Sequence, residues 1–429
     1  MKWDRFMDLT VFETLSYELK EKIAAYEKYA THRNIAFPDT LNKIHVAIGM
    51  RRTGKTWLLF QTIQKILKTE NIPLQRILYL NLEDDRFLPC PQDKLRAILD
   101  GFYQCYPDNH HHVCYLFLDE IQNAEGWPTV IRRFFDTKKV KIFLSGSSAK
   151  LLSKEIATSL RGRAMTTEVW PYDFSEYLSL STHTALPPHS QPWIDYYLFE
   201  LKQYLHTGGF PEIFQVPDIN RRQLLQDYVE IVIMRDLIER YQITNIILVK
   251  YLINFLLKNT SCSFSVNKLA NDIKSQGLSG SRNTLYDYLS YIEDAYLAFA
   301  VPLFSESIRK THTNPRKCYT IDGGLVRAFA LSMNENLGHL FENLVFLQLK
   351  RQQHKIYYYL TQERYEVDFL TEDPQGTKKL YQVVWDDTNE QTMAREKRAL
   401  MIAQEELQLE GAIITPKKWL FDTLGPVYI

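Results

Sequence analysis

The apolar positions of the chain follow different periods in different regions. From Ile44 to about Phe174, short apolar runs alternate with stretches whose apolar residues recur every three or four positions. The runs are "IHVAI", "RILYLNL", "CYLFLD" and "KIFLSG". Continuous runs of this length are typical of strands buried on both faces, with crossover helices between them. The pattern therefore predicts an α/β region built on a parallel sheet.

The flanking regions show other patterns. Residues 1 to about 40 have helical spacing, with Leu15, Leu19 and Ile23 on one face. The proline-rich stretch "LPPHSQP" (186–192) interrupts a mostly helical region that continues to about residue 260. From residue 336 the chain is again α/β, because the helical stretch "ENLVFLQLKR" precedes the strand-like runs "KIYYYLT", "YEVDFLT" and "KKLYQVVW".

Between these regions, residues 264–300 predict two helices, a glycine-bearing turn between them, and a strand-like "LAFAVPLF" after them. This order fits a winged helix-turn-helix. The chain is accordingly divided into four domains: 1–180, the α/β region with an N-terminal helical extension; 181–262, a helical linker or lid; 263–330, a winged helix-turn-helix region; and 331–429, a small α/β domain.

Composition adds limits to this picture. A chain of 429 residues is long for a single core, and its formal net charge of zero gives no global field of the kind expected of a nucleic-acid binder. The five cysteines form no CxxC pair, which favours free thiols in a reducing compartment. No apolar stretch reaches the roughly 20 residues needed to span a bilayer. We therefore expect a cytoplasmic protein with no membrane association.

Residues 49–56 match the phosphate-binding pattern G-x-x-x-x-G-K-[ST] without departure. An apolar strand precedes the motif and a helical stretch follows it, which is the context that this motif requires. Lys55 is expected to reach the β- and γ-phosphates of ATP, and the Thr56 hydroxyl to ligate Mg²⁺. The residues expected to bind the nucleotide are Gly49, Met50, Arg51, Arg52, Thr53, Gly54, Lys55 and Thr56.

A second signal is the apolar run "CYLFLD", which ends in Asp119 and Glu120 in the form of a Walker B element. The end of a parallel strand places such side chains beside the phosphate loop. We expect Asp119 to hold Mg²⁺, directly or through water, and Glu120 to polarise the attacking water. This pair predicts an ATPase and not only a nucleotide-binding protein.

The order of "GMRRTGKT", "LFLDEIQNAEGWP", "FLSGSSAKLL", "SLRGRAMTTEVWPYDFSEYL" and "GGFPEIF" resembles a group of prokaryotic AAA-type ATPases of the archaeal-type branch. The resemblance implies a winged-helix region and a C-terminal domain of unknown function after the ATPase. It also implies that Ser145, at the end of its strand, senses the γ-phosphate, with Ser147 or Ser148 as a helix cap. Arg161 and Arg163 are candidates for an arginine finger, in the same chain or from a neighbouring subunit.

The C-terminal region, with "RKCYTIDGGLVRAF" before it, is similar to the restriction-endonuclease-like fold. Working nucleases of that fold hold Mg²⁺ with acidic residues and activate water with a lysine. Here Glu342 and Asp368 match the acids, but Gln382 and Val384 stand at the second acidic position and at the lysine position. Lys378 and Lys379 lie nearby on the preceding edge of the strand. We expect an inactive scaffold used for binding or assembly, because Val384 leaves the water without a cationic neighbour.

The favoured hypothesis is a nucleotide-driven switch or remodeller that acts on DNA or a protein partner and forms a homo-oligomer. An ATP-gated nuclease and a signal-transducing, defence-type NTPase that controls assembly without DNA remain alternatives. DNA would contact the winged-helix region, where Tyr286 and Tyr288 are interleaved with basic residues. These are Lys268, Lys274, Arg282, Arg309, Lys310, Arg316 and Lys317.

Overall fold

The computed structural model describes residues 9–29, 31–40, 42–147, 160, 162–180, 187–305, 315–330 and 336–425. The chain divides into two compact units, Met1–Trp170 and Pro171–Ile429. Each unit is described by itself below.

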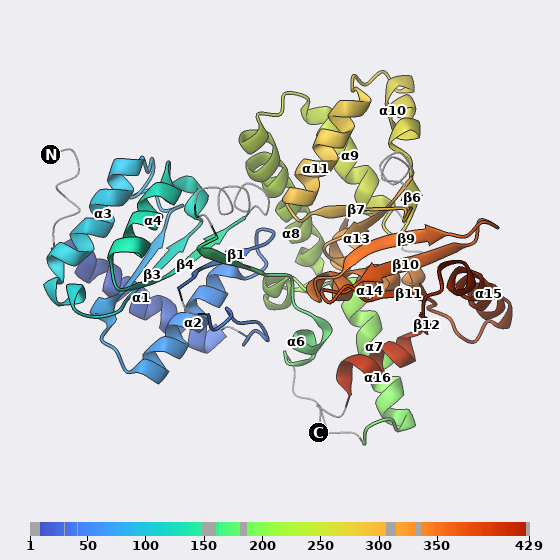
Figure 1. The fold of residues 1–429 in the computed structure, drawn as a ribbon, viewed down its shortest axis with the longest axis horizontal. Helices are drawn as coiled ribbons and strands as arrows, with labels where there is room; N and C mark the ends of the chain where they lie inside the picture. The colour runs from blue at the N-terminus through green and yellow to red at the C-terminus, as the bar shows by residue number, and fades with distance from the viewer. Residues whose placement is uncertain are drawn as a thin grey trace. The chain divides into compact units, whose positions relative to one another are not determined.

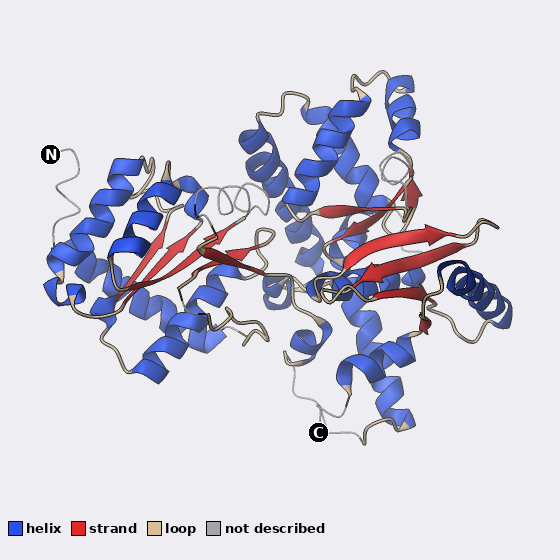
Figure 2. Ribbon diagram, in the orientation of Figure 1, coloured by secondary structure: helices blue, strands red, loops and turns tan. Residues whose placement is uncertain are grey.

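The first unit is built on a five-stranded sheet in which every pair of neighbouring strands is parallel (Figure 2). The strand order is β2-β3-β4-β1-β5. The strands are β1 (Ile44–Ile48), β2 (Ile77–Asn81), β3 (Cys114–Asp119), β4 (Val140–Gly146) and β5 (Ala164–Glu168). The first four coincide with the predicted apolar runs, so the prediction of a parallel α/β sheet is confirmed.

Helices cover both faces of this sheet (Figure 1). They are α1 (Leu9–Tyr29), α2 (Lys55–Glu70), α3 (Gln92–Cys105) and α4 (Trp127–Thr137). The α1–α2 face forms a core in which Leu19 and Leu59 pack with Phe117 and Phe143 of the strands. The predicted N-terminal helix is therefore part of the α/β unit, because its apolar face belongs to the same core as α2 and the strands.

The second unit begins with helices. They are α6 (Phe174–Leu178), α7 (Gln191–Thr207), α8 (Asp218–Ile231), a π-helical continuation (Val232–Glu239) and α9 (Ile246–Lys258). The helix α7 starts within the proline-rich stretch, at Gln191, and the side chain of Ser190 before it accepts a hydrogen bond from the Trp193 N–H. The mostly helical prediction for this stretch is confirmed.

Two further helices and a small antiparallel sheet follow. The helices are α10 (Val266–Ser275) and α11 (Arg282–Asp294), and the sheet has the order β6-β8-β7. Its strands are β6 (Ser263–Phe264), β7 (Ala298–Pro302) and β8 (Arg316–Thr320). The predicted pair of helices and the strand β7 are confirmed, while β6 and β8 had not been identified as strands.

The C-terminal part is a second α/β layer, with α13 (Gly323–Phe329) and α14 (Leu337–Arg351) before a sheet of order β12-β11-β10-β9. The strands are β9 (Lys355–Leu360), β10 (Glu366–Glu372), β11 (Lys378–Val383) and β12 (Gly411–Ile414). The helices α15 (Glu390–Leu407) and α16 (Pro416–Leu424) complete it. Among the described helices of the whole chain, none has the length and apolar character to cross a bilayer.

Candidate nucleotide-binding site

The loop between β1 and α2 requires glycine at both of its ends. Gly49 has a φ of 149°, and a Cβ atom there would lie 2.3 Å from the Val169 carbonyl oxygen. Gly54 has a φ of 97° directly before α2 starts at Lys55. A side chain at either position would strain the backbone, so these residues allow the tight turn from strand to helix. The turn leaves the amino end of a 16-residue helix facing the loop, an arrangement that favours anions.

Lys55 lies inside this loop and is only 4% exposed. Its Nζ atom donates to the carbonyl oxygens of Gly49 and Met50, at 3.0 Å each, and lies 3.9 Å from Glu120 Oε1. The ammonium is therefore held by the loop itself and faces the acidic end of β3. Phosphate oxygens could replace the two carbonyl acceptors without exposing the charge to solvent.

The other loop residues support this conformation. The Thr53 hydroxyl donates to the Met50 carbonyl oxygen at 2.9 Å, and both side chains are fully buried. Arg52 has a φ of 68°, and Arg51 forms an ion pair with Glu83 at 2.7 Å.

The Thr56 hydroxyl and the carboxylate of Asp119 meet at the carboxyl edge of the sheet. Thr56 Oγ1 donates to Asp119 Oδ2 at 2.7 Å, and the Tyr79 hydroxyl donates to the same oxygen at 3.0 Å. Burial and the neighbouring charge of Glu120 raise the pKa of Asp119. A divalent cation would stabilise the charged form of such a carboxylate, so Thr56 and Asp119 are suited to hold Mg²⁺.

Glu120 lies beside this pair in a left-handed backbone conformation, with φ 53° and ψ 51°. Gln122 Nε2 donates to Glu120 Oε2 at 2.5 Å, which holds the carboxylate toward Lys55. Such left-handed residues are uncommon and cluster at functional sites. The backbone thus turns Glu120 away from the strand direction, and its carboxylate is close to the ammonium of the phosphate loop.

Ser145 is fully buried beneath the two acids. Its hydroxyl donates to Asp119 Oδ1 and accepts a hydrogen bond from the Glu120 N–H at 3.0 Å. The structure brings Ser145 to the site, where it orients both acidic residues. Its role as a γ-phosphate sensor stays a prediction. Ser147 is also buried, and its hydroxyl accepts from Gln122 at 3.4 Å.

The two candidate finger arginines are placed differently from the other site residues. Arg161 lies outside the described residues, as does Ser148. Arg163 pairs with Asp136 at 2.9 Å and precedes β5, whose first residue Ala164 is aligned with Ile44 of β1. Since the phosphate loop follows the opposite end of β1, Arg163 is about a strand length away, roughly 16 Å. A finger role for Arg163 would therefore need the site of another subunit.

Sequence reasoning missed Arg33, a buried arginine that precedes β1 and is 4% exposed. Its guanidinium donates to the carbonyl oxygens of Thr53 and Trp170, at 2.8 Å each. This side chain fastens the phosphate loop to the segment that follows β5. Its sequence context, "THRNIAF", is that of an ordinary loop and carries no signal for this contact.

This arrangement agrees with the comparisons. The sequence profile of the family described as "AAA domain" matches residues 41–178, and profiles of two domains of unknown function, DUF8612 and DUF4143, match residues 198–336 and 337–418. The uncharacterized protein MJ1544 of Methanocaldococcus jannaschii is 37% identical over 89% of this chain and 83% of its own length. The chain belongs to the same family as MJ1544.

Two further similarities were found. An uncharacterized protein of Haemophilus influenzae is 28% identical over 75% of this chain and 78% of its own length. The Walker-type ATPase PABY2304 of Pyrococcus abyssi covers 67% of this chain and 90% of its own, with 14% identity and a TM-score of 0.43. The region that matches the AAA domain, residues 41–178, contains the loop, the acids and Ser145, and Arg33 lies just before it.

A second group of candidate residues lies outside the AAA domain. Glu342 of α14 and Asp368 of β10 both contact Lys317 of β8, and Val384 is buried. The expectation that a water held by these acids would have no cationic neighbour overlooked Lys317, whose Nζ lies 2.8 Å from Glu342 and 2.7 Å from Asp368. Among the described residues, no group of three or more histidine, cysteine and acidic side chains is arranged to hold a metal ion.

The structure also corrects part of the prediction that the basic residues of the α10–α11 region contact DNA. Lys268, Lys274 and Arg282 are exposed. Lys317 and Tyr288 are buried, so the prediction that they contact DNA was wrong. The guanidinium of Arg316 lies over the Tyr286 ring, 5.4 Å from its centre, while Arg309 and Lys310 lie outside the described residues.

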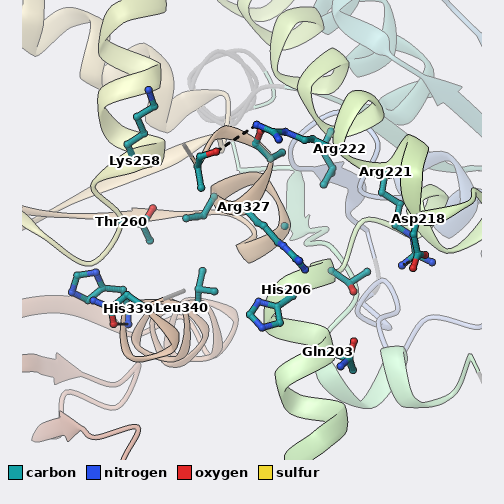
Figure 3. A pocket seen from close by; sticks show the side chains of 17 residues that line it. Gln203, His206, Asp218, Arg221, Arg222, Lys258, Thr260, Arg327, His339 and Leu340 are labelled. Carbon is teal, nitrogen blue, oxygen red and sulfur yellow. Dashed lines mark hydrogen bonds and ion pairs between the residues drawn. The ribbon is translucent and has the colours of Figure 1, made fainter. Parts of the chain in front are cut away.

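The second unit also contains a pocket of about 680 Å³ that the sequence did not predict (Figure 3). Basic side chains dominate its polar lining, but several of them are engaged in the fold. Arg221 pairs with Asp218 at 2.9 Å, and Arg222 donates to the Ala328 carbonyl oxygen at 3.1 Å. These two arginines of the pocket therefore also hold the fold together.

Proposed function

We propose that this protein hydrolyses ATP in its AAA domain and depends on Mg²⁺ to do so. The observation that carries the proposal is the convergence of Lys55, Thr56, Asp119 and Glu120 at one edge of the sheet. The amides of the loop and Lys55 would bind the phosphates, and Thr56 with Asp119 would hold Mg²⁺, which supplies charge neutralisation at the phosphates. Glu120, held by Gln122, would orient the attacking water.

We further propose that nucleotide turnover drives a switch or remodelling step on DNA or a protein partner. The order α9, β6, α10, α11, β7, β8 is compatible with a winged helix-turn-helix, and this supports the proposal of a role in binding. Lys268, Lys274 and Arg282 give this region an exposed positive surface, although Asp272 and Asp287 are exposed there as well. A homo-oligomer is part of the proposal, because Arg163 could serve as a finger only for a neighbouring site.

The rate of ATP hydrolysis distinguishes these partners. It is to be measured with no nucleic acid, with duplex DNA and with single-stranded DNA, each at two salt concentrations. Stimulation by DNA that weakens at high salt would support DNA as the partner, because phosphate contacts release counterions. An ATPase rate that DNA does not change at either salt concentration would favour a protein as the partner. Absence of ATP hydrolysis under every condition would contradict the ATPase proposal.

Replacing both Lys268 and Arg282 with glutamate is expected to abolish DNA binding if the α10–α11 region contacts the backbone. Each substitution reverses an exposed charge, and each lost phosphate contact lowers the slope of log affinity against log salt by about 0.9. Fluorescence anisotropy with a labelled duplex at several salt concentrations measures both effects. A matched control is the double replacement of the exposed residues Lys65 and Lys68 of α2 with glutamate. Equal affinity for both double variants and the native chain would rule out this surface.

The C-terminal domain is expected to leave nucleic acid intact. Gln382 is neutral, and its amide is already engaged: Oε1 accepts from the Asp368 N–H at 3.2 Å and Nε2 donates to Glu396 at 2.7 Å. At this position a metal ion would meet an amide and not a carboxylate. Linear, circular and single-stranded DNA incubated with ATP and Mg²⁺ or Mn²⁺ should show no cleavage on gels. Cleavage that disappears in Asp368→Ala would favour an ATP-gated nuclease instead.

A further inference from the structure

An acidic cluster in the second unit is centred on a lysine. Lys317 comes from β8, Glu342 from α14, and Glu366 and Asp368 from β10. The Lys317 Nζ atom lies 2.8 Å from Glu342 Oε1, 2.8 Å from Glu366 Oε1 and 2.7 Å from Asp368 Oδ1. An ammonium group has three hydrogens, so each can be donated to a different carboxylate. Lys317 is 2% exposed, which places this charge in the interior.

Two further groups donate hydrogen bonds to acids of the cluster. The Tyr319 hydroxyl donates to Glu342 Oε1 at 2.6 Å, and the Val383 N–H donates to Asp368 Oδ2 at 2.9 Å. Both oxygens of Asp368 therefore accept a hydrogen bond. The three acids thus surround a cation that the chain itself supplies.

The charges of the cluster are consistent with this arrangement. Burial by itself lowers the pKa of Lys317, but the charges of Asp368, Glu342 and Glu366 raise it well above its ordinary value. Lys317 is therefore cationic throughout the neutral range. Burial, together with the charge of Asp368, raises the pKa of Glu342 to about 8.

We propose that the Lys317 ammonium is the resident cation of this cluster and occupies the position that a divalent ion would take among the same carboxylates. Oxygen atoms from carboxylates are the ligands that Mg²⁺ and Mn²⁺ prefer, and here they converge on one point. A metal ion sharing these oxygens would lie within about 4 Å of the ammonium, where two positive charges repel strongly in a buried site. The cluster consequently fastens β8 to α14 and β10 and excludes metal.

The proposal can be tested with the full chain, free of nucleotide, by measuring Mn²⁺ uptake and the thermal midpoint. Electron paramagnetic resonance of free Mn²⁺ should show no uptake by the native protein that depends on Asp368. Lys317→Ala should lower the midpoint by about 10 °C, because it leaves buried carboxylates without a partner. Millimolar Mn²⁺ should restore much of this loss by filling the vacated position. The restoration should vanish in Lys317→Ala combined with Asp368→Asn.

Lys379→Ala is the matched control, because Lys379 lies on β11, is half exposed and approaches Glu410 only at 3.8 Å. Its midpoint should not change, with or without Mn²⁺. If Lys317→Ala fails to fold, a second pair of variants tests the proposal. Lys317→Met combined with Asp368→Asn should be more stable than Lys317→Met alone, because the double variant removes one charge of each sign from the native cluster.

Four results would overturn the proposal. The first is Mn²⁺ uptake by the native chain that Asp368→Asn abolishes. The second is a Lys317→Ala midpoint that is unchanged, or lowered but insensitive to Mn²⁺. The third is a Lys317→Met variant that Asp368→Asn does not stabilise. The fourth is DNA cleavage by the native chain that both Lys317→Ala and Asp368→Asn abolish, because Lys317 would then be a catalytic residue.

Discussion

Lys55→Ala is expected to abolish tight ATP binding. Lys55 is the buried ammonium of the phosphate loop, and its Nζ atom is held at 3.0 Å from two loop carbonyl oxygens that phosphate oxygens could replace. Each hydrogen bond to a charged group contributes roughly 1.5–3 kcal/mol, so the loss of contacts to two phosphates should weaken binding by about 100-fold or more. Isothermal titration with a non-hydrolysable ATP analogue measures the affinity directly.

The matched control for this variant is Lys65→Ala, which removes an exposed lysine from the same helix α2. Its affinity for the analogue should equal that of the native chain. If Lys55→Ala also binds the analogue with native affinity, the loop does not bind phosphates in the way proposed.

Glu120→Gln is expected to separate binding from hydrolysis. The substitution keeps the size of the side chain but removes the carboxylate that would accept a proton from water, and such a loss typically slows a reaction by about 10²–10⁴-fold. The phosphate loop, Thr56 and Asp119 are unchanged, so affinity for ATP should be retained. Phosphate release under saturating ATP gives the turnover, and titration with the analogue gives the affinity.

Glu125→Gln, in the exposed turn before α4, serves as the control and should hydrolyse ATP at the native rate. Normal turnover by Glu120→Gln would show that another residue orients the water. The conformation of Glu120 would then need another explanation, since its left-handed backbone and its contact with Gln122 are what single it out in the structure.

The sequence predicted the AAA domain well because the elements that form it have strong local signals. Buried parallel strands are continuous apolar runs, and the phosphate loop has fixed glycine and lysine spacing. The strand β5, "AMTTE", was missed because it lies at the edge of the sheet and is partly exposed, so its sequence is mostly polar. Its pattern of polar and apolar residues does not distinguish it from a loop, and it is recognised as a strand only by its pairing with β1.

The contacts that the sequence could not predict join residues far apart in the chain. Lys317 stands next to Arg316 in "RKCYT", and a basic pair of this kind is usually solvated. Its acids come from 25 to 51 positions later, on elements whose relative placement depends on the fold. The same holds for Ser145, whose position at a strand end was predicted but whose hydrogen bonds to Asp119 and the Glu120 N–H were not.

The contacts of Arg33 determine where an isolated fragment of the AAA domain should begin. The family profile begins at residue 41, yet the guanidinium that ties Thr53 to Trp170 comes from before that point, and Leu19 of α1 belongs to the core beside Leu59. A fragment cut at residue 41 would expose an apolar face and leave two carbonyl groups without their donor. The smallest stretch of this chain that can be expected to keep a working phosphate loop therefore starts with α1.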